Sequence, residues 1–349
     1  MLRHVLLASL VTASAPALAN DSIAELGTGG LILSRTDAII MEKEDLFISQ
    51  DKVTVDYVFR NQSDKDVDTI VAFPMPDIAG SPYEMPAIPK DQDDNFLGFE
   101  VSVDGQAIKP ELEHKAVAVG IDVSDDLKAQ NVPFYPFGQA AVKALEALPQ
   151  DVADDWLDRG IIVIDEFDDG SGMKSVRTPY WQLRSTYWWR AKFPAGKTVK
   201  VAHSYQPSVG GSVGLGFFND GKFQGDDYAD YKQRYCMDDA FERAVARNAK
   251  ENADGYPSLS ENRIAYILKT GGNWATGTIG KFTLTIDKGD AKNLISFCGT
   301  GVEKIGPTTF RMTAEDFYPE RDLDILILSP GQAAEDGDSS APAQGGSGN

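Results

Sequence analysis

The strongest constraint in this sequence is a pair of alternating runs within residues 53–76, VTVDYVFRNQSDKDVDTIVAFPMP. Every second residue over 53–59 is apolar, and β-branched or aromatic residues alternate in the same way over 67–73. This period of two is typical of strands with one buried face. A polar segment of turn-forming residues separates the runs, and Pro74 and Pro76 end the second because proline cannot donate to a strand ladder. The stretch predicts a β-hairpin of a sandwich-type domain.

Other parts of the chain repeat this pattern. Residues 178–190 and 199–205 alternate on either side of a turn, and short apolar runs continue as far as residue 328. Residues 140–159 and a segment near 227–250 instead have helical spacing. We therefore predict a mainly β (α+β) fold, made of antiparallel β-sandwich units with helical insertions.

The predicted organisation follows these changes of pattern. It comprises a signal peptide (1–19), an N-terminal β-sandwich (20–120), a helical insertion (121–160), a second β-rich unit with a helical segment near 227–250 (161–330) and a disordered acidic tail (331–349). The N-terminal unit is expected to open with a short helix over residues 20–31, capped by Asp21 or Ser22 and ended by Gly27.

The first nineteen residues have the features of a secretory signal peptide. A basic start with Arg3 and His4 precedes an apolar stretch, and small residues lead to a cleavage site between Ala19 and Asn20. A lipid anchor is not expected, since position 20 is not cysteine. No later apolar run reaches the ~18 residues that a membrane-spanning helix needs. The sequence predicts a bacterial protein that is periplasmic or secreted.

Charge and cysteine content narrow the class of partner and the compartment. The formal net charge of −20 argues against nucleic acid and anionic lipid surfaces, which are themselves negative. Cys236 and Cys298 are the only cysteines, and export favours a disulfide between them. On the chain-entropy model such a loop stabilises by ~4 kcal/mol. A redox role would need the two cysteines in a C-x-x-C unit, which is not their spacing.

Motifs for catalysis or metal binding are weak. Residues 210–214 match the nucleophile-elbow pattern G-x-S-x-G around Ser212, but no helical run or later histidine follows. The histidines beyond the signal peptide, His114 and His203, come earlier, and His203 is expected to be structural. Acidic loops at 91–95 and 165–169 could offer oxygen ligands to calcium but do not match an EF-hand. We assign no catalytic residue, no cofactor and no metal ligand.

The clearest candidate binding patch centres on Trp188. Alternation along the predicted strand places Trp188 on the opposite face from Trp189, beside Arg184 and Arg190. An exposed tryptophan flanked by arginines suits stacking on a sugar ring or anchoring a protein partner. Alternatively, another layer of the fold covers it.

Several stretches resemble an uncharacterised family of exported bacterial proteins, known as a domain of unknown function. The resemblance is carried by NDSIAELGTGGL, by MEKEDLFISQDKVTVDYVFRNQSDKDVDTIVAFPMPDI, by FPAGKTVKVAHSYQPSVGGS, by GKFTLTIDKGDAKNLISFCGTGVEKIGPTTF and by FYPERDLDILIL. It covers nearly all of the chain after the predicted signal peptide. The resemblance implies export and a β-rich fold, and it brings no catalytic residues. The hairpin alone is similar to the sandwich domain of vault proteins and inter-alpha-trypsin inhibitors, an interaction module.

These observations support three hypotheses about function. The first is a non-enzymatic exported protein that binds an envelope protein or glycan, with its oligomeric state left open. The second is a carboxylate-based hydrolase of envelope polymers, because the acidic excess supplies candidate carboxylates. The third is a carbohydrate-binding or calcium-dependent protein. A cleft that holds two close carboxylates would favour the hydrolase, and a flat exposed Trp188 face would favour binding.

Overall fold

The computed structural model describes residues 20–331, apart from 28–29, 83–86, 91–92, 213 and 252–255. The predicted signal peptide with Ala19, residue Asp91 of the acidic loop, and residues 332–349 of the predicted tail lie outside the described residues. Within the described ranges, no helix is long and apolar enough to cross a membrane.

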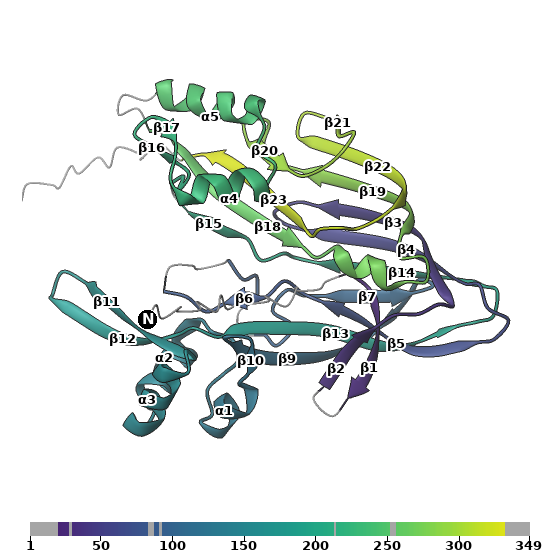
Figure 1. Ribbon diagram of the computed structural model, residues 1–349, viewed down its shortest axis with the longest axis horizontal. Helices are drawn as coiled ribbons and strands as arrows, with labels where there is room; N and C mark the ends of the chain where they lie inside the picture. Colours follow the sequence, from purple (N-terminus) through teal and green to yellow (C-terminus); the bar gives the residue numbers. More distant parts are fainter. Residues whose placement is uncertain are drawn as a thin grey trace, which may run out of the picture.

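Three larger sheets form the body of the protein (Figure 1). We call them the central, lower and upper sheets, after their places in that view. In spatial order the central sheet contains β21 (Glu303–Lys304), β22 (Thr309–Phe317), β19 (Ile279–Asp287), β3 (Ile39–Ile48), β4 (Val53–Asn61), β14 (Thr198–Tyr205), β7 (Glu100–Val103) and β8 (Gln106–Ile108). The parallel pair in this order is β3 with β19, and its other neighbours are antiparallel.

Two smaller sheets complete the body. The lower sheet has the order β10 (Ile121–Asp122), β9 (Glu111–Ala118), β13 (Gln182–Phe193), β5 (Val67–Pro74), β1 (Ser22–Gly27) and β2 (Gly30–Ser34), with β6 (Ile78–Ala79) also paired to β13. The upper sheet has the order β15 (Gly210–Ser212), β18 (Leu259–Tyr266), β23 (Leu323–Pro330) and β20 (Leu294–Phe297). Two separate hairpins are β11 (Ile162–Asp168) with β12 (Met173–Pro179), and β16 (Phe218–Asn219) with β17 (Lys222–Phe223).

The lower and upper sheets both pack on one face of the central sheet. Along β4, Val55, Tyr57 and Phe59 are buried, whereas Asp56 and Arg60 on the other face are exposed. The hydroxyl of Tyr57 lies 3.1 Å from that of Tyr266 in the upper sheet. Apolar residues of all three sheets form one continuous core. The mainly β sandwich predicted from the alternation is therefore confirmed.

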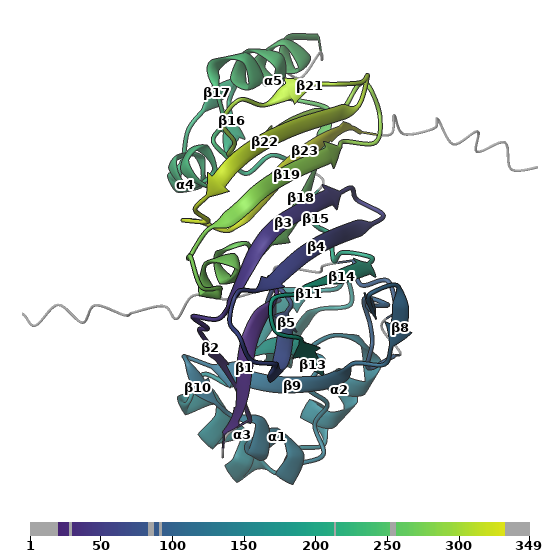
Figure 2. The ribbon, with the colours of Figure 1, turned by 90° about the vertical axis from the view of Figure 1, so that its right-hand side faces the viewer.

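Helices cover the two ends of the molecule (Figure 2). Helices α4 (Asp226–Arg234) and α5 (Asp239–Glu251) pack against the upper sheet, where Leu326 and Leu328 face them while Ile325 and Ile327 face the central sheet. Helices α1 (Ser124–Ala129), α2 (Gly138–Glu146) and α3 (Gln150–Asp158) lie within the segment predicted as a helical insertion. They surround a second core that contains Trp156 and Trp181.

The predicted hairpin over residues 53–76 is wrong in its pairing, although both strands exist. β4 belongs to the central sheet and β5 to the lower sheet, so the chain crosses between layers at residues 62–66. Asn61 stabilises the crossing, because its Nδ2 donates to the carbonyls of Lys65 and Phe193, each at 2.8 Å. The next pair behaves in the same way: β13 lies in the lower sheet and β14 in the central sheet. Alternation shows that one face of a strand is buried, but it does not identify the neighbouring strand.

The short helix expected over residues 20–31 is also wrong. Residues Ser22–Gly27 form β1, which pairs with both β2 and β5. Ile23 and Ala24 are buried in the sandwich, so tertiary pairing overrides the local helix signals. More generally, strands from the predicted N-terminal unit and from the predicted second unit share the central and lower sheets.

A disulfide joins Cys236, between α4 and α5, to Cys298, which follows β20. It is the pair predicted from the sequence, and it closes a loop of 62 residues. The bond therefore ties the end of α4 to the upper sheet.

Reduction of this disulfide should destabilise the protein without unfolding it. Loss of a loop constraint worth ~4 kcal/mol should lower Tm by roughly 5 to 10 °C. Calorimetry with and without reductant measures the shift. Alkylation without reductant should add no mass to the unfolded protein, and two adducts would contradict the disulfide.

Candidate functional site

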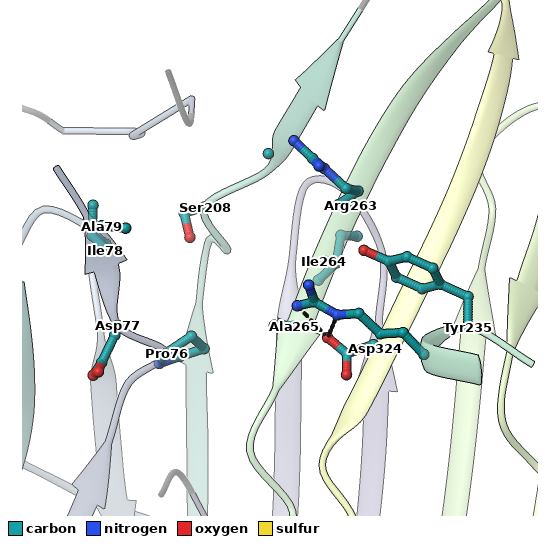
Figure 3. A pocket seen from close by; sticks show the side chains of 12 residues that line it. Pro76, Asp77, Ile78, Ala79, Ser208, Tyr235, Arg263, Ile264, Ala265 and Asp324 are labelled. Atoms are coloured by element: carbon teal, nitrogen blue, oxygen red, sulfur yellow. Dashed lines mark hydrogen bonds and ion pairs between the residues drawn. The ribbon is translucent and has the colours of Figure 1, made fainter. Parts of the chain in front are cut away.

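A cleft separates the edge of the lower sheet from the edge of the upper sheet (Figure 3). One wall is the segment 76–79, which includes β6, and the other is formed by residues 263–265 of β18. Its volume is about 170 Å³. The cleft exists because β15 pairs with β18 only as far as Arg263, which leaves this edge of β18 uncovered from Ile264 onward among the described strands.

Arg263 brings a positive charge to the cleft. Its Nη1 donates to the hydroxyl of Tyr231 at 3.0 Å, and that hydroxyl donates to Glu261 at 2.8 Å. The Arg263 side chain is half-buried, and the charge of Glu261 acts on it through this link, but Arg263 forms no direct ion pair among the residues that the structure describes. A guanidinium that is oriented by a hydroxyl and has no directly paired carboxylate can donate its remaining N–H groups to an anionic group of a ligand.

A second arginine on the same wall is already neutralised. The Nε and Nη2 of Arg234 both donate to Oδ1 of Asp324, at 3.0 and 2.8 Å, and its guanidinium lies 5.5 Å from the ring centre of Tyr235. Figure 3 shows Arg234, Arg263 and Tyr235 on the side of the cleft opposite Asp77. The disulfide follows directly after Tyr235 at Cys236, so it helps to fix this wall.

The opposite wall carries Asp77. Its Oδ2 accepts a hydrogen bond from Nε of Arg184 at 3.0 Å. Burial raises the pKa of Asp77, although Arg184 opposes this effect. The charge of Asp77 is therefore balanced by Arg184 of the lower sheet, and Asp77 does not form an ion pair with Arg263 on the other wall.

The predicted patch of Trp188, Arg184 and Arg190 does not line this cleft as a unit. All three residues lie on the outer face of β13, but Arg184 is engaged by Asp77. Trp188 is half-buried, because it packs with apolar side chains of the β1–β2 hairpin and of the neighbouring strand β5. These neighbours are Ala24, Leu31, Leu33, Ile70 and Ala72. Arg190 is exposed. A binding role for this face remains a prediction.

The sequence motifs for catalysis and metals do not assemble into a site. Ser212 lies on the edge strand β15 and donates to the carbonyl of Gly214, while His114 contacts Ser185 at 2.9 Å on another sheet. Among the described residues, no three His, Cys, Asp or Glu side chains converge as metal ligands. Asn95 of the acidic loop bonds Phe99 and Tyr187.

A group of buried polar residues lies where the three sheets meet. We call it the junction cluster, and its members are Asn20, Asp21, Glu44, Tyr57, His203 and Tyr266. The amide of Asn20 donates to Glu44 Oε2 at 3.0 Å, and the hydroxyl of Tyr57 donates to the Asn20 carbonyl oxygen Oδ1. His203 Nε2 lies 3.5 Å from Asp21 Oδ1.

Burial dominates the electrostatics of the junction cluster. It raises the pKa of Asp21 well above its usual range, with a further contribution from Glu44, and raises the pKa of Glu44 to about 8. Burial also lowers the pKa of His203 to about 3. The imidazole is enclosed by aromatic rings, with Phe73 at 4.7 Å and Phe99 at 5.0 Å between ring centres. It is a buried, neutral structural histidine.

Apart from the structural role expected for His203, sequence patterns do not indicate this cluster, and one reason is a β-bulge. The register of β3 against β4 shifts between Met41 and Lys43. Met41 points into the core before the shift, and Glu44 and Leu46 do so after it. One extra residue therefore turns a carboxylate inward that regular alternation places on the other face.

Acid should destabilise the protein through His203. The unfolded chain binds a proton at this residue near pH 6.5, whereas the folded chain resists protonation until about pH 3. This stabilising contribution is therefore complete above pH 6.5 and is lost as the pH falls towards 3, by up to about 1.4 kcal/mol per pH unit. Urea denaturation between pH 4.5 and 7 should show a shallower dependence in His203→Phe. An equal dependence of the free energy of unfolding on pH in both proteins would contradict this prediction. The control variant His114→Asn should keep the contribution of His203.

Removal of the Trp188 side chain should also reduce stability, because the β1–β2 hairpin packs on it. Trp188→Ala should lower the free energy of unfolding by about 1 to 3 kcal/mol, measured by urea denaturation. Arg190→Ala, on the same face but exposed, should change it by less than about 0.5 kcal/mol. An unchanged stability in Trp188→Ala would show that this face is open for a partner.

Comparisons with known proteins give a family but no activity. No curated protein matches the chain. One solved structure with some similarity is described as a "putative nutrient binding protein" from Legionella pneumophila, at 13% identity and a TM-score of 0.38, with 88% of this chain and 72% of that chain covered. At that TM-score the likeness supports no conclusion about this chain. Residues 19–326 match the family described as "Domain of unknown function (DUF4424)", and the chain belongs to that family.

Proposed function

We propose that this protein is an exported, non-enzymatic binding protein, and that its ligand places a carboxylate or phosphate group in the cleft between the lower and upper sheets. The observation that carries the proposal is the Arg263 guanidinium, which lies in an open cleft without an ion-pair partner among the described residues. The predicted signal peptide supports export. The ligand could belong to a small molecule or to an envelope component.

The geometry of the cleft favours recognition of a single anionic group. Its volume of about 170 Å³ accommodates a group the size of a carboxylate or phosphate with a few attached atoms. Arg263 is oriented by Tyr231, so little side-chain freedom is lost on binding. The partly exposed side chains of Pro76, Ala79 and Ala265 supply apolar surface beside it. This combination of a few fixed polar groups with apolar walls is typical of ligand sites.

The alternative of a carboxylate-based hydrolase would use Asp77 and Asp324, the acidic residues of the cleft. Each is held by an arginine, Asp77 by Arg184 and Asp324 by Arg234. A hydrolase of this type needs two carboxyl groups free to act on opposite sides of one bond, whereas each of these is already hydrogen-bonded to an arginine. The arrangement therefore supports binding over hydrolysis.

Substitution of Arg263 tests the proposal. Calorimetric titration with a panel of small organic acids and phosphate esters should identify a ligand, and Arg263→Gln should weaken its binding by about 10- to 100-fold, because a charge-assisted hydrogen bond is lost. Arg190→Gln removes an equal charge outside the cleft and should leave the affinity unchanged. Equal binding by Arg263→Gln, or binding only of neutral sugars or calcium, would contradict the proposal.

A further inference from the structure

The first described residues of the chain are completely buried at the point where the three sheets meet. Asn20 and Asp21 have no solvent-exposed surface. The carbonyl of Asn20 accepts from Oγ1 of Thr270 at 2.7 Å, and the carbonyl of Asp21 accepts from Nε1 of Trp274 at 2.9 Å. The contacts come from η1 (Lys269–Asn273) and the residue after it. A Cβ on Gly271 of η1 would lie 2.8 Å from the Asn20 amide nitrogen, so this position fits only glycine without rearrangement.

This buried segment contains acidic groups without a cation. Neither carboxyl oxygen of Asp21 has a hydrogen-bond partner among the described residues, and Glu44 lies close enough to raise the pKa of Asp21. In the described part of the chain, the basic group beside Asp21 is His203, whose Nε2 lies 3.5 Å from Asp21 Oδ1 and which burial keeps neutral, and no lysine or arginine forms an ion pair with Asp21 or Glu44. Two buried carboxyl groups in this position are costly unless a positive charge accompanies them.

We propose that proteolytic cleavage before Asn20 supplies this charge, so that the new α-ammonium group of Asn20 becomes the counter-ion of Asp21 and Glu44. The predicted signal-peptide cleavage site lies at this bond. The nitrogen that cleavage releases belongs to the residue whose side-chain amide already contacts Glu44 at 3.0 Å, and it precedes Asp21 by one residue. Export would then complete the junction of the sheets.

The chemistry requires only water and a leader protease. Hydrolysis of the peptide bond before Asn20 consumes one water molecule and leaves a carboxylate on the leader and an ammonium group on Asn20. One ammonium balances one negative charge, so the Asp21–Glu44 pair is half ionised, with one carboxylate and one protonated carboxyl. His203 stays neutral beside it. The uncleaved chain keeps an uncharged amide at this nitrogen and must bury both carboxyls as acids.

This difference predicts that the stability of the two chains depends differently on pH. In the uncleaved chain Glu44 keeps its proton until about pH 8, whereas the unfolded chain loses it near pH 4.5. Stability is therefore lost as the pH rises from 4.5 to 8, and the α-ammonium should remove much of this loss. The titratable groups around the Asp21–Glu44 pair are Asp45 on β3, Tyr57 on β4, His203 on β14 and Tyr266 on β18.

The experiment compares the chain that begins at Asn20 with the same chain extended by its own residues 18–19. At pH 7.5 the extended chain should melt several degrees lower, and the difference should shrink at pH 5. The same comparison is then made with Asp21→Asn and Glu44→Gln combined in both chains. If the extension acts only by steric crowding, it should lower Tm as much in this double variant as before. If it acts by removing an ion pair, the double variant should show no difference in Tm between the extended chain and the chain that begins at Asn20. Equal Tm values for the chains without these substitutions would overturn the proposal.

Chemical labelling of the amine gives a second readout, which does not depend on how well the variants fold. In the folded chain that begins at Asn20, acylation of the α-amino group should be at least tenfold slower than in urea, while surface lysines react at similar rates in both. Rapid acylation in the folded protein, or an exported protein whose first residue is not Asn20, would overturn the proposal. Neither result depends on the ligand cleft, so failure here is distinguishable from failure of the binding proposal.

Discussion

The structure depends on one constraint: a single face of the central sheet is covered by two other sheets. Residues of β4 and β14 must contact both, which is why Tyr57 reaches Tyr266 of the upper sheet while the neighbouring His203 contacts the rings of Phe73 and Trp189 in the lower sheet. The chain satisfies this requirement by crossing between layers after β4 and again after β13. The two crossings meet at Asn61, whose amide bonds both Lys65 and Phe193.

Two sheets that share one face leave a seam between them, and two neighbouring parts of that seam differ. At Tyr266 of β18 the seam is filled by the junction cluster, where Asn20 and Asp21 bring polar groups into the core. At residues 263–265 of the same strand, β15 is too short to cover the edge, and the cleft with Arg263 remains open. The cluster joins side chains of the sheets, and the cleft is the place that we propose for a ligand. Architecture and proposed function therefore arise from the same seam.

Much of the fold could be predicted from the sequence, because a strand with one buried face shows an alternation of apolar and polar residues. That pattern located β4, β5, β13 and β14 as strands. It could not reveal that β4 and β5 lie in different sheets, since the short polar segment between them suits a hairpin or a crossing equally well. The helix expected at residues 20–31 failed for a related reason: Ile23 and Ala24 are fixed by pairing with β5, a contact distant in sequence.

The site was harder to predict than the fold. Cys236 and Cys298 could be paired because they are the chain's two cysteines and predicted export favours a disulfide between them. Arg263 lies in the region where the sequence shows short apolar runs, but its accessibility depends on the residue at which β15 ends, and no residue type in the sequence indicates that position. Glu44 is turned inward by a bulge, so alternation alone gives the wrong face. Sites that depend on register and strand length are not visible in residue patterns.

Native-state hydrogen exchange tests most directly whether the junction unites the three sheets. If it does, the slowest amides of β1, β4, β14 and β18 should exchange with one common free energy, equal to that of global unfolding. If β18 and β23 opened together with α4 and α5 at a much lower free energy than β4 and β14, the upper sheet would be an independent unit. The seam would then not be the feature on which the fold depends.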